Sequence, residues 1–214
     1  MLNYFKRFIC LSVVCILFLF SINTFSENNS ATAALSQLLL QLKTYQANFT
    51  QLTYDSKGNV IQRSHGYMMI KRPGGFRWES DSPTKQILIT DGNLLWVYNV
   101  DLAQATKSLV DQKANINPAS LLSGSVINLT RAFVISRLHV PGQIFLLQPK
   151  QLQGGTQFKW LQLKFVRGEL TQMKVLNNLD ETSIFDFSHI QMNAPLSSNV
   201  FRFAPPAGVD VVVQ

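Results

Sequence analysis

The sequence predicts a mainly β fold, a strongly curved open antiparallel sheet or incomplete barrel of about eleven strands. Three observations support this class. Apolar and polar residues alternate in many short segments, turn-forming residues separate these segments, and only one long stretch has helical spacing. Because a long run of consecutive antiparallel strands curls, we expect one face of the sheet to be concave and apolar.

One amphipathic helix comes first. Apolar residues recur three and four positions apart from Ala31 to about Gln46, and Ser30 or Thr32 can cap the start. We expect residues 27–30 to form a loose tail in front of this helix. The apolar stripe that the helix would bury consists of Leu35, Leu38, Leu39 and Leu42.

The hydrophobic period then changes to two, which indicates strands. Asp91-Gly92-Asn93 is a good hairpin turn between two of them. In the middle of the chain, Asn117 and Pro118 favour a short helix through Leu122, and residues 128–133 favour another helical turn or two. The expected strands cover residues 49–54, 60–71, 76–79, 85–90, 94–99, 104–110, 143–148, 158–166, 170–176, 182–192 and 200–203.

The helices need a surface on which to bury their leucines, and the concave side of the sheet is the natural one. A cavity left between a sheet and a few helices would bind an apolar ligand. The same elements could instead pack into a filled core, and composition alone favours the filled core.

Residues 1–26 have the pattern of a cleaved secretory signal. Lys6 and Arg7 precede an apolar run, and small residues follow it at the expected cleavage site after Ser26. The run is shorter than the roughly 20 residues of a membrane-spanning helix, although a retained anchor is the alternative. Cleavage would leave a single domain over residues 27–214 and would lower the net charge from +7 to +5, because Lys6 and Arg7 are lost.

Both cysteines, Cys10 and Cys15, lie inside this segment, so the mature chain could form no disulfide and no cysteine-based metal or redox site. Val14 precedes Cys15 where lipoprotein processing needs a small residue, so we expect no lipid modification. The positive charges are scattered, and nothing resembles the basic stripe of a nucleic-acid-binding protein.

No catalytic arrangement is visible in the sequence. His65, His139 and His189 stand in no metal-ligand spacing, and Ser123-Gly124-Ser125 lacks the frame of a nucleophile elbow. The carboxylates are dispersed, and the adjacent pair Asp180-Glu181 fits a solvated turn. We therefore expect neither an enzyme nor a cofactor.

Three strings between residues 70 and 106 are more specific. They are Lys-Arg-Pro-Gly-Gly-Phe-Arg-Trp-Glu at 71–79, Thr-Asp-Gly-Asn-Leu-Leu-Trp-Val-Tyr at 90–98 and Gln-Ala-Thr at 104–106. In order and spacing they resemble the LolA family of outer-membrane lipoprotein carriers of Gram-negative bacteria. The opening helix with Phe49-Thr50-Gln51 and the ending at 201–211 also resemble that family.

The resemblance implies an unclosed antiparallel β-barrel with a lid of short helices. It also implies a monomeric periplasmic chaperone that takes acylated lipoproteins from an inner-membrane ABC transporter to an outer-membrane receptor. Each exposed acyl methylene costs about 0.8 kcal/mol in water, so a carrier must cover the chains in an apolar cavity. The basic balance could assist docking to acidic partners or anionic membrane surfaces.

The resemblance also assigns residue roles. Arg72 matches an arginine that ties the lid shut through hydrogen bonds to lid backbone, where an ordinary edge-strand arginine is the alternative. Gly75 stands where many relatives carry a basic residue, which would loosen the loop and alter partner docking. The residues expected at the cavity mouth, in its wall and in the lid are, respectively, Phe76 and Trp78; Ile87, Ile89 and Trp96; and Leu121 and Leu122.

Three other functions compete with the carrier. The outer-membrane receptor of the same fold is itself lipidated, and the mature chain would lack the cysteine for this. A periplasmic lipid-sensing regulatory domain of similar fold usually has a second domain, for which the chain leaves no room. A lipid hydrolase needs a nucleophile–base pair, which the sequence does not show.

Overall fold

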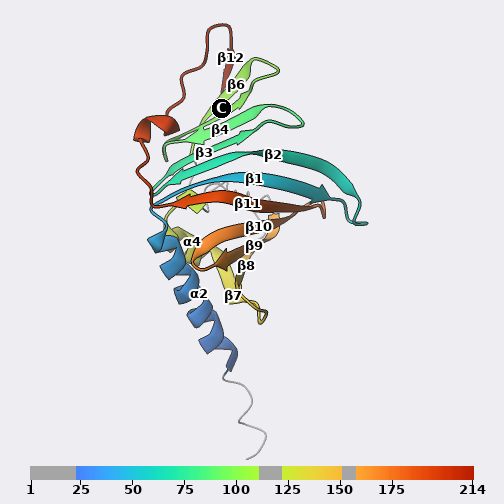
Figure 1. Cartoon of the computed structure of the whole chain (residues 1–214), viewed down its shortest axis with the longest axis vertical. Coiled ribbons are helices and arrows are strands. Elements are labelled where there is room, and N and C mark those ends of the chain that lie inside the picture. Colours follow the sequence, from blue (N-terminus) through green and yellow to red (C-terminus); the bar gives the residue numbers. More distant parts are fainter. Residues whose placement is uncertain (1–22, 111–121, 151–157) are drawn as a thin grey trace, which may run out of the picture.

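A computed structural model of the chain describes residues 23–110, 122–150 and 158–214. Among these residues lie two complete α-helices, one short 3₁₀-helix and one large sheet (Figure 1). The helices are α2 (Asn23–Gln41), α4 (Val126–Ala132) and η1 (Ser198–Phe201). The strands are β1 (Thr44–Tyr54), β2 (Val60–Lys71), β3 (Gly75–Ser80), β4 (Gln86–Thr90), β5 (Leu94–Asn99), β6 (Gln104–Leu109), β7 (Phe133–Arg137), β8 (Gln143–Pro149), β9 (Phe158–Val166), β10 (Glu169–Asn177), β11 (Thr182–Met192) and β12 (Asp210–Val213).

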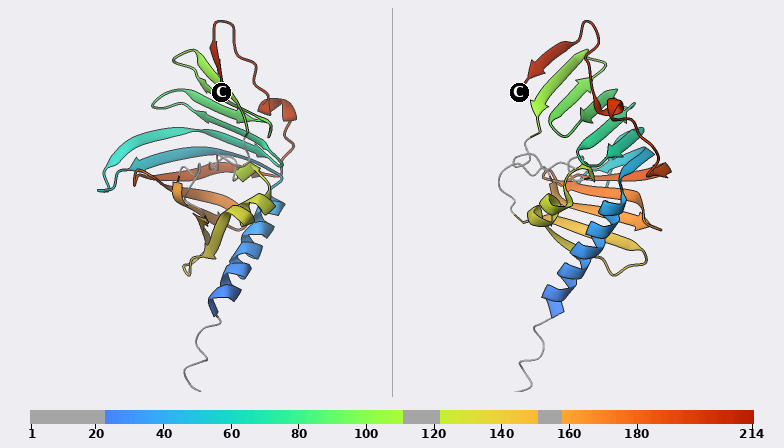
Figure 2. Two further views of the ribbon diagram at one scale, coloured as in Figure 1. Left: turned by 180° about the vertical axis from the view of Figure 1, so that it is seen from behind. Right: turned by 90° about the vertical axis from the view of Figure 1, so that its left-hand side faces the viewer.

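The strands form one 12-stranded sheet in the order β12-β6-β5-β4-β3-β2-β1-β11-β10-β9-β8-β7. Its neighbours are antiparallel except β12 and β6, which run parallel. Within the described ranges β12 and β7 form the two edges and do not pair with each other, so the sheet is open. The predicted mainly β, unclosed fold is confirmed, and the strands curve around one side (Figure 2).

The first helix differs from its prediction at both ends. It starts at Asn23, so residues 27–30 are helical rather than a loose tail, and Ser30 and Thr32 lie inside the helix instead of capping it. It ends at Gln41, before the expected end near Gln46. The reason is tertiary, because the chain from Thr44 onward pairs with both β2 and β11.

The apolar stripe of α2 is buried as predicted. Leu35, Leu38, Leu39 and Leu42 have little or no exposed surface. The helix packs against β7 at one end of the sheet, and Leu129 of α4 joins the same core. The helices therefore cover the inner side of the sheet, the side that holds the main hydrophobic core (Figures 1 and 2).

The strand register shows which side chains share that inner side, because directly paired residues point to the same face. Tyr45, Ala47 and Phe49 of β1 pair with Ile70, Met68 and Gly66 of β2, and all five apolar side chains are buried in the core.

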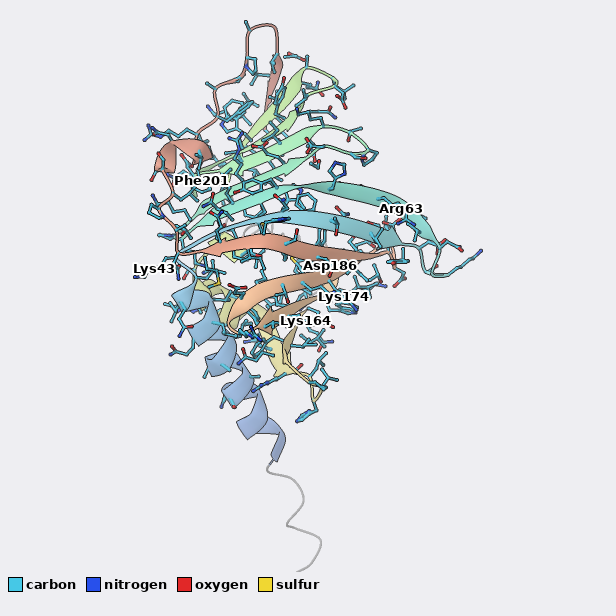
Figure 3. The ribbon with its side chains drawn as sticks, viewed as in Figure 1. Lys43, Arg63, Lys164, Lys174, Asp186 and Phe201 are labelled. Carbon is cyan, nitrogen blue, oxygen red and sulfur yellow. The ribbon has the colours of Figure 1, made fainter. Side chains whose placement is uncertain are left out.

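The outer face of the lower half-sheet is more polar. Lys164 of β9, Lys174 of β10 and Asp186 of β11 project from it (Figure 3). Gln172 pairs with both Lys164 and Asp186, and its side-chain amide donates to the Asp186 carboxylate at 2.7 Å. This alternation, apolar inside and charged outside, is the pattern of a sheet with one solvated face.

The helical turn or two expected over residues 128–133 is confirmed as α4, which ends at Ala132 where the chain continues as β7. One strand prediction was wrong. Residues 200–203 were expected to form a strand, but η1 occupies Ser198–Phe201. Backbone pairing is replaced there by side-chain contacts with β3, since Arg77 donates to the Val200 carbonyl. The helix expected over 117–122 lies, apart from Leu122, outside the described residues.

Gly66 is a strict packing requirement at the centre of the sheet. A Cβ there would meet the Glu79 carbonyl oxygen at 1.8 Å and the Phe49 ring at 2.8 Å. We predict that Gly66→Ala lowers the free energy of unfolding by about 3 kcal/mol, the upper part of the range for overpacking a core. Urea unfolding followed by circular dichroism measures this change.

Gly58→Ala is the control, because Gly58 has a φ of +86° and no atom within 4 Å of a Cβ. In Gly58→Ala the free energy of unfolding should fall only by the cost of a positive φ in a residue with a side chain, about 1–2 kcal/mol. Equal losses in the two variants would contradict the packing role of Gly66.

Candidate functional site

Two of the predicted cavity residues, Phe76 and Trp78, lie on the inner side of the sheet. They pair with Ile70 and Met68 of β2, and Phe76 is 3% exposed whereas Trp78 is half-buried. The Trp78 ring stacks on Phe49, with 3.8 Å between centroids and 25° between planes. These contacts place Trp78 at the border of the main core.

From Trp78 an apolar row continues across the upper half-sheet. Its members are directly paired from strand to strand, so they share the inner face: Trp78, Leu88, Val97, Thr106 and Val212. Trp78 and Leu88 still touch the core, whereas Val212 on the edge strand is 39% exposed. We call these five residues the inner row. The only polar side-chain groups of these five residues are the Thr106 hydroxyl and the Trp78 indole N–H.

The other three predicted wall residues do not lie there. Ile89 pairs with Arg77 and Trp96, and Ile87 pairs with Glu79. Since residues 76 and 78 face inward, residues 77 and 79 and their partners face outward. The prediction that Ile87, Ile89 and Trp96 share a wall with Phe76 and Trp78 is therefore corrected, because the strands alternate and both of their faces are apolar.

A C-terminal segment covers this outer apolar face. We call residues 194–209 the strap. Phe203 of the strap lies 5.3 Å, between ring centroids, from both Trp96 and Tyr98. Lys71 donates to the Leu196 carbonyl and to the Ser198 hydroxyl, each at 2.8 Å. The outer face of β3–β5 is thus closed by the chain itself, which leaves the inner face as the candidate site.

Gly75 belongs to the strap contact. It lies in β3, not in a loose loop, and a Cβ there would meet the Lys71 carbonyl oxygen at 2.9 Å and the Phe201 ring at 3.2 Å. Phe201 itself is 3% exposed and is labelled beside β3 in Figure 3. The expectation that Gly75 loosens the loop is wrong, because the missing side chain makes room for Phe201.

Arg72 follows β2 and reaches the segment that leads into α4. Its Nη1 donates to the Gly124 carbonyl at 2.7 Å, and next to it the Gly74 amide donates to the Ser123 carbonyl at 2.9 Å. Burial lowers the pKa of Arg72 to about 10, so the guanidinium stays charged at neutral pH. A charged donor makes a stronger bond to a carbonyl than a neutral one.

Leu122, one of the two predicted lid leucines, is 1% exposed and belongs to the main core. Leu121 lies outside the described residues. The Arg72 side chain therefore bonds a segment that is also anchored by an apolar residue two positions before Gly124.

Other kinds of site find little support in the described part of the chain. No group of three or more potential metal ligands occurs among those residues. A pocket of ≈ 560 Å³ lies between α2, at Ser30 and Ala31, and the turn from β7 to β8. The Arg137 guanidinium in its lining does not suit an apolar ligand.

Sequence reasoning missed Phe49 and Leu88 on the inner side and Phe203 on the strap. The first two could have been found by extending the alternation from Trp78 across the neighbouring strands. Phe203 could not, because its contacts with β5 join residues more than a hundred positions apart without regular pairing.

Comparisons with known proteins agree with this architecture. The chain is 55% identical over 199 residues to the outer-membrane lipoprotein carrier protein of Coxiella burnetii (strain RSA 331 / Henzerling II), which covers 92% of this chain and 94% of the relative. It is 34% identical over 190 residues to the protein of the same name from Pseudomonas paraeruginosa (strain DSM 24068 / PA7), covering 88% and 90% of the two chains.

Among solved structures, a LolA superfamily protein from Nitrosomonas europaea superimposes with a TM-score of 0.51 at 13% identity, over 83% of this chain and 98% of the other. This likeness concerns the fold. The family described as outer membrane lipoprotein carrier protein LolA matches residues 40–204. The curved open sheet and its apolar inner row agree with these matches. The chain therefore belongs to the LolA family of outer membrane lipoprotein carriers, which are not enzymes.

Proposed function

We propose that the chain carries lipoproteins through the periplasm by holding their acyl chains on the inner face of the sheet, along the inner row. The observation that carries this is the continuity between the main core and the half-buried Trp78 and Leu88. An acyl chain laid on this row extends the core without opening it. At about 0.8 kcal/mol for each methylene removed from water, even partial cover of a long chain is worth several kcal/mol.

The row also suits release. A carrier that enclosed its cargo completely would hold it too tightly, whereas this row runs from Trp78, which packs against the core, to Val212, which is 39% exposed at the edge. The outer face offers no comparable surface, because the strap covers Trp96 and Tyr98.

The proposal assigns Arg72 the role of a latch. Its bond to Gly124 ties the turn between β2 and β3 to the segment that precedes α4. Such a bond stabilises the closed, empty state. It therefore favours release of cargo, because binding must break it and unloading restores it.

We further propose the partners and the route. Residues 1–26 act as a cleaved signal that directs a monomeric domain of residues 27–214 to the periplasm. An inner-membrane ABC transporter supplies acylated lipoproteins, and an outer-membrane receptor accepts them. No helix among the described residues is both long and apolar enough to span a membrane.

The first prediction compares two tryptophans on opposite faces. Trp78→Ala should weaken binding of a fluorescent long-chain fatty acid about tenfold, since burial of an aromatic side chain against a ligand is worth roughly 1.5–3 kcal/mol. Trp96→Ala is the matched control, because Trp96 is also half-buried but faces the strap. Fluorescence titration measures both affinities, and an equal loss in the two variants would argue against the inner row.

The second prediction concerns the latch. Arg72→Leu should still take labelled lipoprotein from spheroplasts but pass less of it to receptor-bearing outer membranes. A hydrogen bond to a charged donor contributes roughly 1.5–3 kcal/mol. Without it, the variant should bind cargo at least about tenfold more tightly than the unmodified chain. The soluble and membrane fractions are counted after incubation with the purified chain.

Arg63→Leu provides the control, because Arg63 is an exposed arginine on the outer face of β2, the strand that Arg72 follows. It should load and unload like the unmodified chain. Failure of the unmodified chain to release any lipoprotein, with its native transporter present, would refute the carrier proposal itself.

A further inference from the structure

We propose that Gly92 positions the latch: the turn between β4 and β5 is a fixed support against which the Arg72-bearing turn between β2 and β3 rests. The inference builds on the proposed role of Arg72 and adds Gly92, a residue on a different turn. It rests on a backbone-to-backbone contact between two glycines, Gly74 and Gly92.

The two turns meet too closely for any side chain between them. A Cβ on Gly74 would lie 2.9 Å from the Gly92 Cα and 3.3 Å from the Asp91 carbonyl oxygen. In the reverse direction, a Cβ on Gly92 would lie 3.2 Å from the Gly74 Cα. Both glycines also have positive φ, +88° and +98°. Each turn therefore limits how far the other can move.

On its other sides the Arg72-bearing turn makes the contacts that define the latch. The Gly74 amide donates to the Ser123 carbonyl at 2.9 Å, and the Arg72 amide donates to the Lys43 carbonyl at 2.8 Å. Gly74 thus joins two contacts, one with Gly92 and one with Ser123. A displacement of Gly74 away from Gly92 must change the geometry of its hydrogen bond to Ser123.

The supporting turn is stiffened by its own hydrogen bonds. The Gly92 amide donates to the Thr90 hydroxyl at 2.9 Å, and the amides of Asn93 and Leu94 donate to the Asp91 carboxylate at 2.9 and 3.0 Å. These amides hold the pKa of Asp91 below its usual value. Because these bonds hold the turn between β4 and β5 in place, volume added at Gly92 presses on Gly74 of the Arg72-bearing turn.

The test is Gly92→Ala compared with Gly168→Ala. Gly168 has a φ of +84°, lies in the turn between β9 and β10, and has no atom within 4 Å of a Cβ. Both variants incur the backbone strain of a positive φ, but only Gly92→Ala presses on the latch. Hydrogen exchange at the Gly74 amide is measured by NMR on the secreted chain, with the Phe49 amide of the central strand β1 as the internal reference.

We expect exchange at Gly74, relative to Phe49, to rise at least tenfold in Gly92→Ala and to stay unchanged in Gly168→Ala. Of the two glycine variants, only Gly92→Ala should transfer less cargo to receptor-bearing membranes. Arg72→Leu should show the same decrease. Should Gly92→Ala prove too unstable to purify, Gly92→Asn adds the same Cβ with a residue that tolerates positive φ better.

Equal Gly74 exchange in the two glycine variants overturns the inference, whatever Arg72→Leu does. Faster exchange in Gly92→Ala together with normal transfer by Arg72→Leu has a different meaning. In that case the positioning contact stands, and the proposed latch function of Arg72 fails.

Discussion

The constraint on which the rest of this structure depends is that strands β4 and β5 are apolar on both faces. Alternation sends Trp78, Leu88 and Val97 inward and Ile89 and Trp96 outward. Each of the two apolar faces must be shielded from water, because apolar surface exposed to water costs free energy in proportion to its area. The strap covers the outer face at Trp96 and Tyr98, so the inner face is the one that remains for an exchangeable ligand.

This division explains features that otherwise look unrelated. Gly75 lacks a side chain because Phe201 occupies the space, and Lys71 and Arg77 donate to strap carbonyls that no strand pairs with. On the inner side, the contacts of Arg72 and Gly74 with the segment before α4 lie at the same end of the sheet. The segment before α4 and the strap are therefore fixed to neighbouring residues of one β2–β3 hairpin, from opposite faces.

Much of this could be predicted from the sequence. The period-two segments and their turns predicted most strands within a few residues, and the leucine spacing identified the buried stripe of the first helix. The resemblance of residues 71–106 to the LolA family was sufficient for fold and function, which the comparisons confirm. Arg72 was singled out by the same strings, and the structure places it beside Gly124.

The remainder depends on contacts between distant parts of the chain. No local pattern says which face of a doubly apolar strand is inner, so Ile87, Ile89 and Trp96 were assigned to the wrong side. The parallel pairing of β12 with β6, and η1 where a strand was expected, follow from the strap's path along β3. The approach of Gly74 and Gly92 is equally invisible in sequence, where each glycine looks like an ordinary turn residue.

The central claim, that cargo acyl chains lie on the inner row, is tested most directly by photo-crosslinking. A lipoprotein whose acyl chain carries a diazirine is loaded onto the chain and irradiated, and the labelled residues are identified by mass spectrometry. The account predicts labels on the inner row, at Trp78, Leu88 and Val97. Labels concentrated on the strap or on Trp96 would contradict it.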